Sequence, residues 1–304
     1  MKHWRYVQAC SKGTSHFVNN SPCQDRALSK AIVDRDGQEI FLGAVADGAG
    51  SASHSEHGAE EATSLILTKL ERFFQQGGVL TEISQITVEQ WINQISDQIG
   101  ELADNEGVSR REYACTLLVV AVASTKGVFF QIGDGVIVIG FEGDYSPVFW
   151  PMNGEYANST YFITDASSAS SLQFKMIDNQ IIEDVALMSD GLQGLALQFA
   201  TRTAHSPFFR PMFTRLREEN NAGLSKILSA SLERFLDSET VCNRTDDDKS
   251  LILSTCRGNS FHSVISDENL EQNDTLRSSK PPHFIRRRSR SWWRRASSYN
   301  TRRH

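Results

Sequence analysis

The amino-acid sequence predicts an α+β fold: a four-layer α-β-β-α sandwich in which two antiparallel sheets pack face to face and helices cover the outside. The first observation behind this prediction is that short apolar runs typical of strands come in two blocks. The second is that pairs of helical patterns lie between and after these blocks. A strict alternation of strand and helix would predict a parallel sheet, so the observed order favours antiparallel sheets.

The first block contains three strand patterns. Residues 4–9 form a plausible edge strand, and residues 27–33 and 39–46 flank Asp36-Gly37. Asp-Gly favours a two-residue hairpin turn. Turn chemistry alone explains this dipeptide, so we assign it no function.

Two helices are predicted next. Residues 55–76 carry apolar side chains at helical spacing, and Gly77-Gly78 ends the pattern. The second helix is predicted to start at Thr87, with Gln90 three residues later completing a capping box. Its apolar side consists of Trp91, Ile92, Ile95, Ile99 and Leu102.

The second block has strand patterns at residues 114–123, 127–132 and 136–141. Residues 145–180 are rich in Ser and Asn and poorly periodic, so short strands and loops are expected there. The pattern then predicts a strand at residues 185–188, three helices and a closing strand. The helices are expected at residues 192–202, 211–220 and 224–237, and the closing strand at residues 251–256.

Composition excludes several classes of protein. The chain has 304 residues, 39% of them hydrophobic and 22% charged, which is ordinary for a globular protein. Its longest apolar run, residues 115–123, is far shorter than the roughly 20 residues of a membrane helix. The N-terminus has no hydrophobic signal segment, so a cytoplasmic location is expected. The five cysteines are scattered without a CxxC pair, which argues against a disulfide framework or structural zinc.

The charge is divided unevenly along the chain. Residues 257–304 contain 11 Lys and Arg against 4 Asp and Glu, a net charge of +7. Because the whole chain carries −6, residues 1–256 carry −13. We expect a folded domain at residues 1–257 and a basic, disordered tail at residues 258–304, because the tail has too few aliphatic residues to fold alone.

Three strand patterns end in Asp-Gly: at Asp47-Gly48, at Asp134-Gly135 and at Asp190-Gly191. The triplet Asp246–Asp248 precedes the closing strand. One Asp-Gly after a strand is usually only a turn, in which Gly lets the backbone turn sharply. Three single aspartates and one aspartate triplet at strand ends instead indicate one acidic pocket, which would bind a hard cation such as Mg²⁺ or Mn²⁺.

The order of these motifs resembles the metal-dependent protein phosphatases of type 2C, the PPM family, and in particular a bacterial branch of it. The resemblance spans residues 13–254. It rests on QDRA, AVADGAGS, SEHGAEEA, ACTLLVVAV, QIGDG, ALMSDGL and DDDKSLIL, in that order.

The resemblance implies two Mn²⁺ or Mg²⁺ ions between the sheets. Asp47 would bridge them, and the carbonyl of Gly48 would complete the coordination of one ion. Asp190 and Asp247 would hold the other ion, with Asp248 as the rival to Asp247. Asp25 would support the second metal, largely through bound water.

The resemblance also implies an accessory position for a third ion, lined by Asp134 and Asp190. Asp47 and Asp190 would be the catalytic residues. Two metals lower the pKa of a shared water, so that a bridging hydroxide attacks phosphorus while the cations offset charge on the phosphoryl oxygens. Gln24 is expected to be a hydrogen-bonding neighbour and not a ligand.

The chain departs from the family pattern at two positions, that of the proton donor and that of the Arg that holds the substrate phosphate. Many members have a His as proton donor two residues after the bridging Asp, where this chain has Ala49. Many also have an Arg shortly before the first acid to hold the substrate phosphate, whereas the nearest Arg here is Arg26, on the far side. The sequence offers four candidates without choosing among them: Lys12, His16, His54 and His57.

Two function hypotheses follow. The first is an intracellular, metal-dependent hydrolase that removes phosphate from phosphoserine and phosphothreonine of proteins. Its natural counterpart would be a Ser/Thr kinase. The second is a catalytically weak or inactive scaffold of the same fold that binds a kinase or phosphoprotein. Ala49 and the missing Arg favour the scaffold, but the retained acids argue against it.

The basic tail has its own alternatives. It is a solvated end, or its Arg clusters with Trp292 and Trp293 contact an anionic surface. Ser289 and Ser297 follow paired arginines, as in sites of kinases that prefer basic flanks. No nucleic-acid partner is expected for the catalytic domain.

Overall fold

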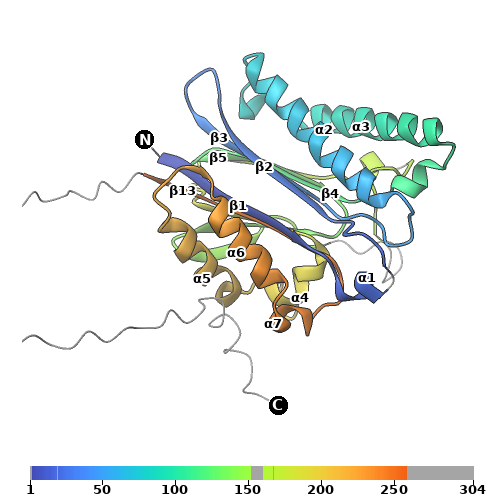
Figure 1. Ribbon diagram of the computed structural model, residues 1–304. Coiled ribbons are helices and arrows are strands. Elements are labelled where there is room, and N and C mark those ends of the chain that lie inside the picture. Colours follow the sequence, from blue (N-terminus) through green and yellow to red (C-terminus); the bar gives the residue numbers. More distant parts are fainter. Residues whose placement is uncertain (1, 19, 152–159, 167, 259–304) are drawn as a thin grey trace, which may run out of the picture.

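Two β-sheets lie face to face between two sets of helices (Figure 1). The computed structural model describes residues 2–18, 20–151, 160–166 and 168–258. The predicted tail at residues 258–304 therefore lies outside the described residues except for Gly258, as do residues 152–159 of the Ser- and Asn-rich segment. The last strand ends at Gly258, where it pairs with Lys2 of the first strand.

The first sheet is antiparallel throughout, with the strand order β2-β3-β4-β5-β8. A hairpin joins β2 to β3 as predicted, but its loop is residues 34–38 and is longer than the two-residue turn expected at Asp36-Gly37; within this loop only Gly37 has a positive φ, of +77°. The strands are β2 (Arg26–Val33), β3 (Glu39–Ala46), β4 (Leu117–Val122), β5 (Lys126–Ile132) and β8 (Gln173–Asp178).

The second sheet has the order β12-β1-β13-β9-β6-β7 and is antiparallel except for a two-residue parallel pairing of β1 with β12. Strand β1, predicted to be an edge strand, lies one place in from the edge, because it pairs with β12 as well as with β13. The adjacent strands β1 and β13 come from opposite ends of the described chain. The strands are β1 (Lys2–Ser11), β6 (Val136–Phe141), β7 (Asp144–Pro147), β9 (Asp184–Met188), β12 (Gly223–Leu224) and β13 (Lys249–Gly258).

Helices cover both outer faces, as Figure 1 shows. Helices α2 (Ser55–Gln75) and α3 (Gln85–Glu106) cover the first sheet. The second sheet is covered mainly by α5 (Ser206–Arg217) and α6 (Lys226–Leu236). The short helices are α1 (Thr14–Val18), α4 (Gln193–Ala196) and α7 (Glu239–Cys242), with 3₁₀ turns at Leu80–Glu82, Arg110–Tyr113, Ser168–Ser171 and Asp190–Leu192.

Three apolar layers separate the four layers of secondary structure. Strand β4 illustrates the arrangement, because Leu117 and Val119 face the helices whereas Leu118 and Val120 face the opposite sheet. Side chains alternate between the two faces of a strand, so a strand that is buried on both faces needs an unbroken apolar run. The predicted sandwich of two antiparallel sheets is confirmed.

The structure corrects the boundaries of three predicted helices. Helix α3 starts at Gln85, and its cap is Ser84, whose hydroxyl accepts a hydrogen bond from the N–H of Thr87. The helix predicted for residues 192–202 is wrong, because only α4 is helical and the chain then forms the hairpin β10 (Leu197–Gln198) and β11 (Thr203–Ala204). An apolar spacing over so few residues does not distinguish one helix from a turn of helix plus a hairpin.

The third correction concerns α5, which begins at Ser206 and not at residue 211. Pro207 fits the first turn, where no N–H is needed. Pro211 lies inside the helix and removes one backbone hydrogen bond. The buried apolar face of the helix compensates for this loss; it consists of Phe208, Phe209, Met212, Phe213 and Leu216.

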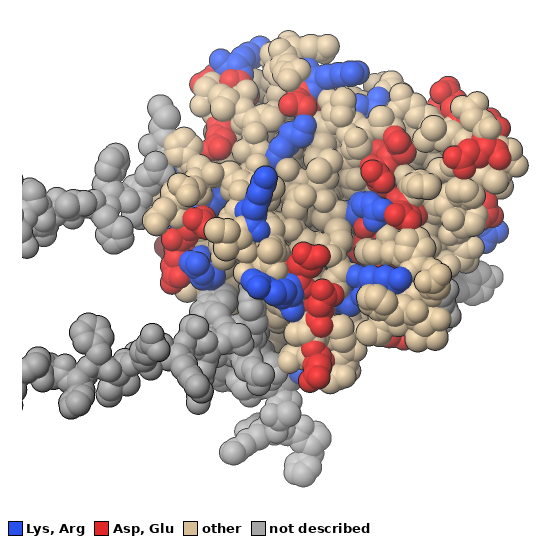
Figure 2. All heavy atoms as spheres, viewed as in Figure 1, with Lys and Arg blue, Asp and Glu red and all other residues tan. Residues whose placement is uncertain are grey.

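Among the described residues, no helix combines the length and the apolar character needed to cross a bilayer. On the face shown in Figure 2, acidic and basic side chains are interspersed. This face therefore carries no large field of a single sign.

Candidate metal centre

The predicted acidic residues converge at one end of the sandwich because of strand register. In the first sheet, Arg26 pairs with Ala46, which sets Asp25 and Asp47 side by side just beyond the ends of β2 and β3. In the second sheet, Met188 of β9 pairs with residues of both β6 and β13. The turns before β6, after β9 and before β13 therefore meet, and they carry Asp134, Asp190 and Asp247.

Four of these aspartates line one cavity of about 190 Å³: Asp47, Asp134, Asp190 and Asp247. Asp25 is fully buried and does not line it. Its Oδ2 atom accepts a hydrogen bond of 2.6 Å from the hydroxyl of Ser189, which links the two sheets. The rest of the lining is His16, Gln24, Gly48, Ala49, Gly50, Thr116, Thr160 and Phe162.

The loop that carries Asp47 is held by backbone contacts. The Asp47 N–H donates to the hydroxyl of Thr116 at 2.9 Å, and the Thr116 N–H donates to the Asp47 carbonyl at 2.8 Å. A Cβ atom at Gly48 would lie 2.8 Å from the carbonyl oxygen of Ser55 and 2.9 Å from that of Gln24. The Gly of this Asp-Gly is therefore needed for close packing, beyond the turn itself.

Burial and mutual repulsion raise the pKa values of Asp25, Asp47 and Asp190. Burial, together with the charge of Asp248, raises the pKa of Asp25 to about 7. Burial and the charge of Asp134 raise the pKa of Asp190 to about 6. The pKa of Asp47 is raised well above its usual range by burial and then by Asp25 and Asp190, and it shares a hydrogen bond with the carboxyl of Asp190. Without cations, this cluster retains protons.

The residues present fit hard divalent cations. Two buried carboxylate oxygens, Asp25 Oδ1 and Asp190 Oδ1, lack a hydrogen-bond partner among the described residues, as does Gln24 Oε1. Unpaired buried oxygens of this kind are costly unless a cation or water satisfies them. In the described part of the chain, no three His, Cys, Asp or Glu side chains enclose an ion by themselves. The carboxylates instead surround a space that has room for water, which Mg²⁺ in particular retains in its coordination shell.

The raised pKa values predict that metal-free protein loses stability as pH rises. Asp25 and Asp190 have folded pKa values of about 7 and about 6, whereas an unfolded Asp titrates near ~4. Between the unfolded and folded pKa values, the folded state therefore binds more protons than the unfolded state, and this difference stabilises the fold. The stabilisation is fully present below pH ~4 and is lost as pH rises through ~6 to 7. In EDTA, we expect the urea concentration at the unfolding midpoint to decrease when the pH is raised from 5 to 7.5. Added Mn²⁺ should restore this midpoint at pH 7.5. The fall should shrink in Asp25→Asn, and an unchanged fall in that variant would contradict the prediction.

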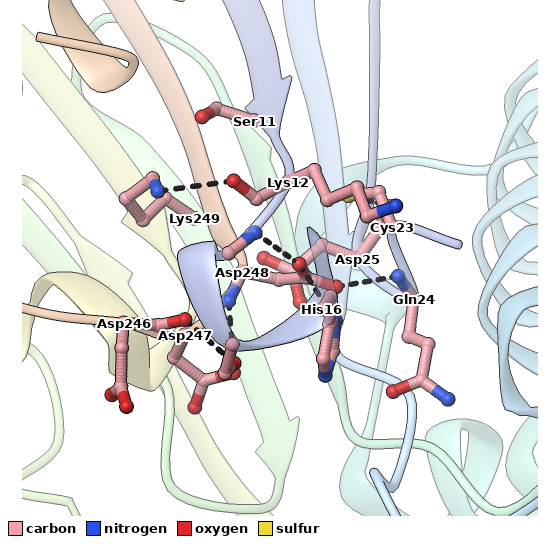
Figure 3. A network of polar contacts seen from close by, with 12 residues as sticks. Ser11, Lys12, His16, Cys23, Gln24, Asp25, Asp246, Asp247, Asp248 and Lys249 are labelled. Carbon is pink, nitrogen blue, oxygen red and sulfur yellow. Dashed lines mark hydrogen bonds and ion pairs between the residues drawn. The ribbon is translucent and has the colours of Figure 1, made fainter. Parts of the chain in front are cut away.

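Asp248, the rival ligand, has its oxygens engaged elsewhere (Figure 3). Its Oδ1 accepts a 2.6 Å hydrogen bond from the Gly13 N–H and lies 2.9 Å from Nδ1 of His16. Its Oδ2 accepts a 2.6 Å hydrogen bond from the Gln24 N–H. Asp248 does not line the cavity, whereas Asp247 does. The third acid of the triplet, Asp246, is exposed and points away from Asp248.

Comparison with known proteins identifies the family. The model of the family described as "Protein phosphatase 2C" matches residues 12–237. The chain belongs to the protein phosphatase 2C family. It is 34% identical over 251 residues to the Serine/threonine-protein phosphatase 3 of Escherichia coli (strain K12), and the match covers 83% of this chain and 98% of that protein. The predicted enzyme class, a protein serine/threonine phosphatase, is confirmed.

Solved structures agree with the fold of this phosphatase. A bacterial serine phosphatase superposes with a TM-score of 0.54 at 15% identity, covering 84% of this chain and 99% of the other. The catalytic domain of the serine/threonine phosphatase PstP, solved with two manganese ions, superposes with a TM-score of 0.52 at 12% identity, covering 85% of this chain and all of the other. At such low identity these likenesses show the fold alone.

The structure separates the four candidates for the missing proton donor and phosphate contact. Only His16 lines the cavity of this phosphatase. His54 stacks on Tyr113 and lies 3.3 Å from Glu106, and His57 is exposed. Lys12 lies over the ring of Phe17, 4.6 Å from its centroid.

Arg26 contacts residues of the fold and does not line the cavity. It forms a 2.5 Å ion pair with Glu56 and donates to the backbone carbonyls of Cys23 and Asp25. Its side chain therefore fixes the segment that precedes β2.

Sequence reasoning missed the hydroxyl residues around the acids. Thr160 donates a 2.7 Å hydrogen bond to Asp134 Oδ2, and Ser189 holds Asp25. Ser189 and Thr116 lie within the motifs ALMSDGL and ACTLLVVAV, so the available signal was a polar residue directly after or before an apolar strand run. Nothing in the local pattern marks Thr160.

Proposed function

We propose that this phosphatase hydrolyses phosphoserine and phosphothreonine of proteins at a centre of two Mn²⁺ or Mg²⁺ ions. The observation that carries the proposal is the cavity of about 190 Å³ lined by four aspartates from distant parts of the chain, with Asp25 beneath it. Membership of the protein phosphatase 2C family supports the reaction, and the fit of the oxygen donors supports the cations.

The proposed ligands take different positions in the cavity. Asp47 would contact both ions, and the Gly48 carbonyl would contact one of them. Asp190 and Asp247 would hold the other ion, and Asp134 with Asp190 would line a third position. Asp25, which cannot reach the cavity lining, would act on the second ion largely through water and through its charge on Asp47.

The two ions, when bound, would polarise the phosphoryl oxygens and lower the pKa of a shared water that attacks phosphorus. The protein's part is to hold the carboxylates in place. The pKa values of Asp47 and Asp190 are raised, mainly by burial, so cation binding must displace protons from these carboxyls. Activity should therefore require more metal at low pH than at high pH.

The substrate would be a phosphorylated protein, and a Ser/Thr kinase its natural counterpart. The acidic surroundings disfavour an anionic substrate unless cations are bound. The activity should therefore depend steeply on the concentration of Mn²⁺ or Mg²⁺. We further propose that residues 1–257 form the catalytic domain, that the basic tail at residues 258–304 contacts an anionic surface, and that the enzyme acts in the cytoplasm.

The proposal is tested by p-nitrophenyl phosphate hydrolysis with increasing Mn²⁺. We expect turnover to depend on Mn²⁺ and to fall in Asp190→Asn by roughly a hundredfold or more, since a lost ligand weakens charge stabilisation worth several kcal/mol. The matched control is Asp144→Asn. Asp144 also follows a Gly, in the β6–β7 hairpin, but its side chain is 96% exposed and does not line the cavity.

The alternative function, a phosphatase-fold scaffold, predicts another result. Because Ala49 replaces the usual His, the scaffold hypothesis expects equal and negligible turnover in the parent, in Asp190→Asn and in Asp144→Asn. That outcome at saturating Mn²⁺ would refute the proposed activity.

A further inference from the structure

A second and larger hollow lies beside the acidic cavity. This groove, of about 700 Å³, shares three lining residues with the cavity: Ala49, Thr160 and Phe162. It is therefore continuous with the place where a phosphoryl group would be hydrolysed. Its size suits a short stretch of polypeptide, whereas the cavity of about 190 Å³ suits only the reacting group.

One Arg lines this groove. Arg111 lies on the 3₁₀ turn Arg110–Tyr113, and its side chain is exposed. The turn is attached to the loop that carries Asp47, because the Ala49 N–H donates to the Ala114 carbonyl at 2.9 Å and Gly48 forms a β-bridge with Cys115. The position of Arg111 is thus fixed relative to the cavity.

The acidic residues of the groove are engaged in local contacts. Glu112 accepts hydrogen bonds of 2.9 Å and 2.8 Å from the N–H and the hydroxyl of Ser53. Asp165 accepts a 2.9 Å hydrogen bond from the Phe162 N–H. By contrast, the guanidinium of Arg111 makes no hydrogen bond or ion pair with any residue that the structure describes.

The neighbouring Arg110 has a different environment. Its guanidinium lies 3.7 Å from Asp97 and donates to the hydroxyl of Ser96 at 3.4 Å, both on α3. Arg110 does not line the groove. Two adjacent arginines therefore differ in role: Arg110 contacts the helix layer, and Arg111 faces the groove with its donors available.

We propose that the groove binds the polypeptide next to the phosphorylated residue and that Arg111 pairs with an acidic side chain of that polypeptide. The inference rests on the proposed function. A guanidinium offers a planar set of donors that matches a carboxylate, and partial enclosure in a groove limits screening by water. The phosphoryl group itself is assigned to the cavity, whose described lining does not include Arg111.

The test uses two phosphothreonine peptides that differ only in Glu or Lys at the positions flanking the phosphorylated residue. The parent enzyme with Mn²⁺ should show a kcat/KM for the Glu peptide that is about three- to tenfold higher than for the Lys peptide. Arg111→Glu should invert this ratio, and Arg111→Lys should retain the preference. Arg110→Glu is the matched control, since it changes the charge equally one residue away, and its ratio should equal that of the parent.

Hydrolysis of p-nitrophenyl phosphate distinguishes failure of the proposed phosphatase activity from failure of the proposed role of Arg111. Absence of Mn²⁺-dependent turnover in the parent would refute the proposed function. Turnover with a Glu-to-Lys ratio that Arg111→Glu leaves unchanged, or that Arg110→Glu shifts equally, would overturn only the role of Arg111. An equal loss on both peptides and on p-nitrophenyl phosphate in Arg111→Glu would assign Arg111 to the phosphoryl group and also overturn the inference.

Discussion

Replacement of Asp47 by Asn is expected to lower kcat/KM with Mn²⁺ by roughly a thousandfold or more while the protein stays folded. The loss follows because the proposed bridging carboxylate would position both cations, whose charge stabilisation is worth several kcal/mol. The fold should persist because an Asn side chain can still donate a hydrogen bond to Asp190, and because the pKa of Asp47 is raised by burial and by crowding with Asp25 and Asp190.

The check on Asp47→Asn combines kinetics with urea unfolding. In EDTA, the free energy of unfolding of the variant should equal or exceed that of the parent, since one buried carboxyl has been removed. Added Mn²⁺ should stabilise the parent and have little effect on the variant. Activity like that of the parent would refute the bridging role, and loss of folding in EDTA would show that Asp47 acts in the structure.

Asp247 and Asp248, adjacent in the sequence, are expected to give opposite results on replacement by Ala. Asp248 is 2% exposed and accepts hydrogen bonds from the N–H groups of Gly13 and Gln24. Its removal leaves both donors and His16 without their partner, so the free energy of unfolding in EDTA should fall by about 3–5 kcal/mol. Since small domains have only about 5–15 kcal/mol in total, this is a large share.

Asp247→Ala should lower the free energy of unfolding in EDTA by at most about 1 kcal/mol, because it removes one hydrogen bond, from the Asp248 N–H to Asp247 Oδ1, while it also removes a crowded acid. The pKa of Asp247 is raised, mainly by burial, so its charged form is not favoured in the metal-free protein. The same variant should need far more Mn²⁺ for activity. If Asp247→Ala were the unstable variant and Asp248→Ala the one with weakened metal dependence, the proposed ligand would have to be exchanged.

The fold was predictable because its inner strands are buried on both faces. The apolar runs of β3, β4 and β13 lie between two apolar layers, so their composition alone identified them as strands. Short elements were not predictable in this way. The hairpin β10–β11 is held by contacts such as the 2.7 Å hydrogen bond from the His205 N–H to the Ala196 carbonyl, which no local pattern records.

The candidate site was predictable as a set of residues but not as a geometry. Each of the three Asp-Gly motifs lies next to a strand, which the sequence shows. That these strands place their aspartates at the same end of the sandwich depends on the pairing of Met188 with Val136 and Leu251, residues far apart in the sequence. The choice between Asp247 and Asp248 depended on which carboxylate the Gly13 and Gln24 backbones contact. The ligand roles themselves stay a prediction.

The sequence by itself determined the composition of this protein's site, because an acid at the end of an apolar run can be recognised locally. Only the tertiary structure decided the surroundings: which acid lines the cavity, that His16 alone of the four candidates for proton donor or phosphate contact lines it, and that Arg111 faces the adjoining groove while Arg110 does not. The physical reason is that burial and hydrogen bonding are set by segments distant along the chain, whereas turn and strand preferences are set by neighbours.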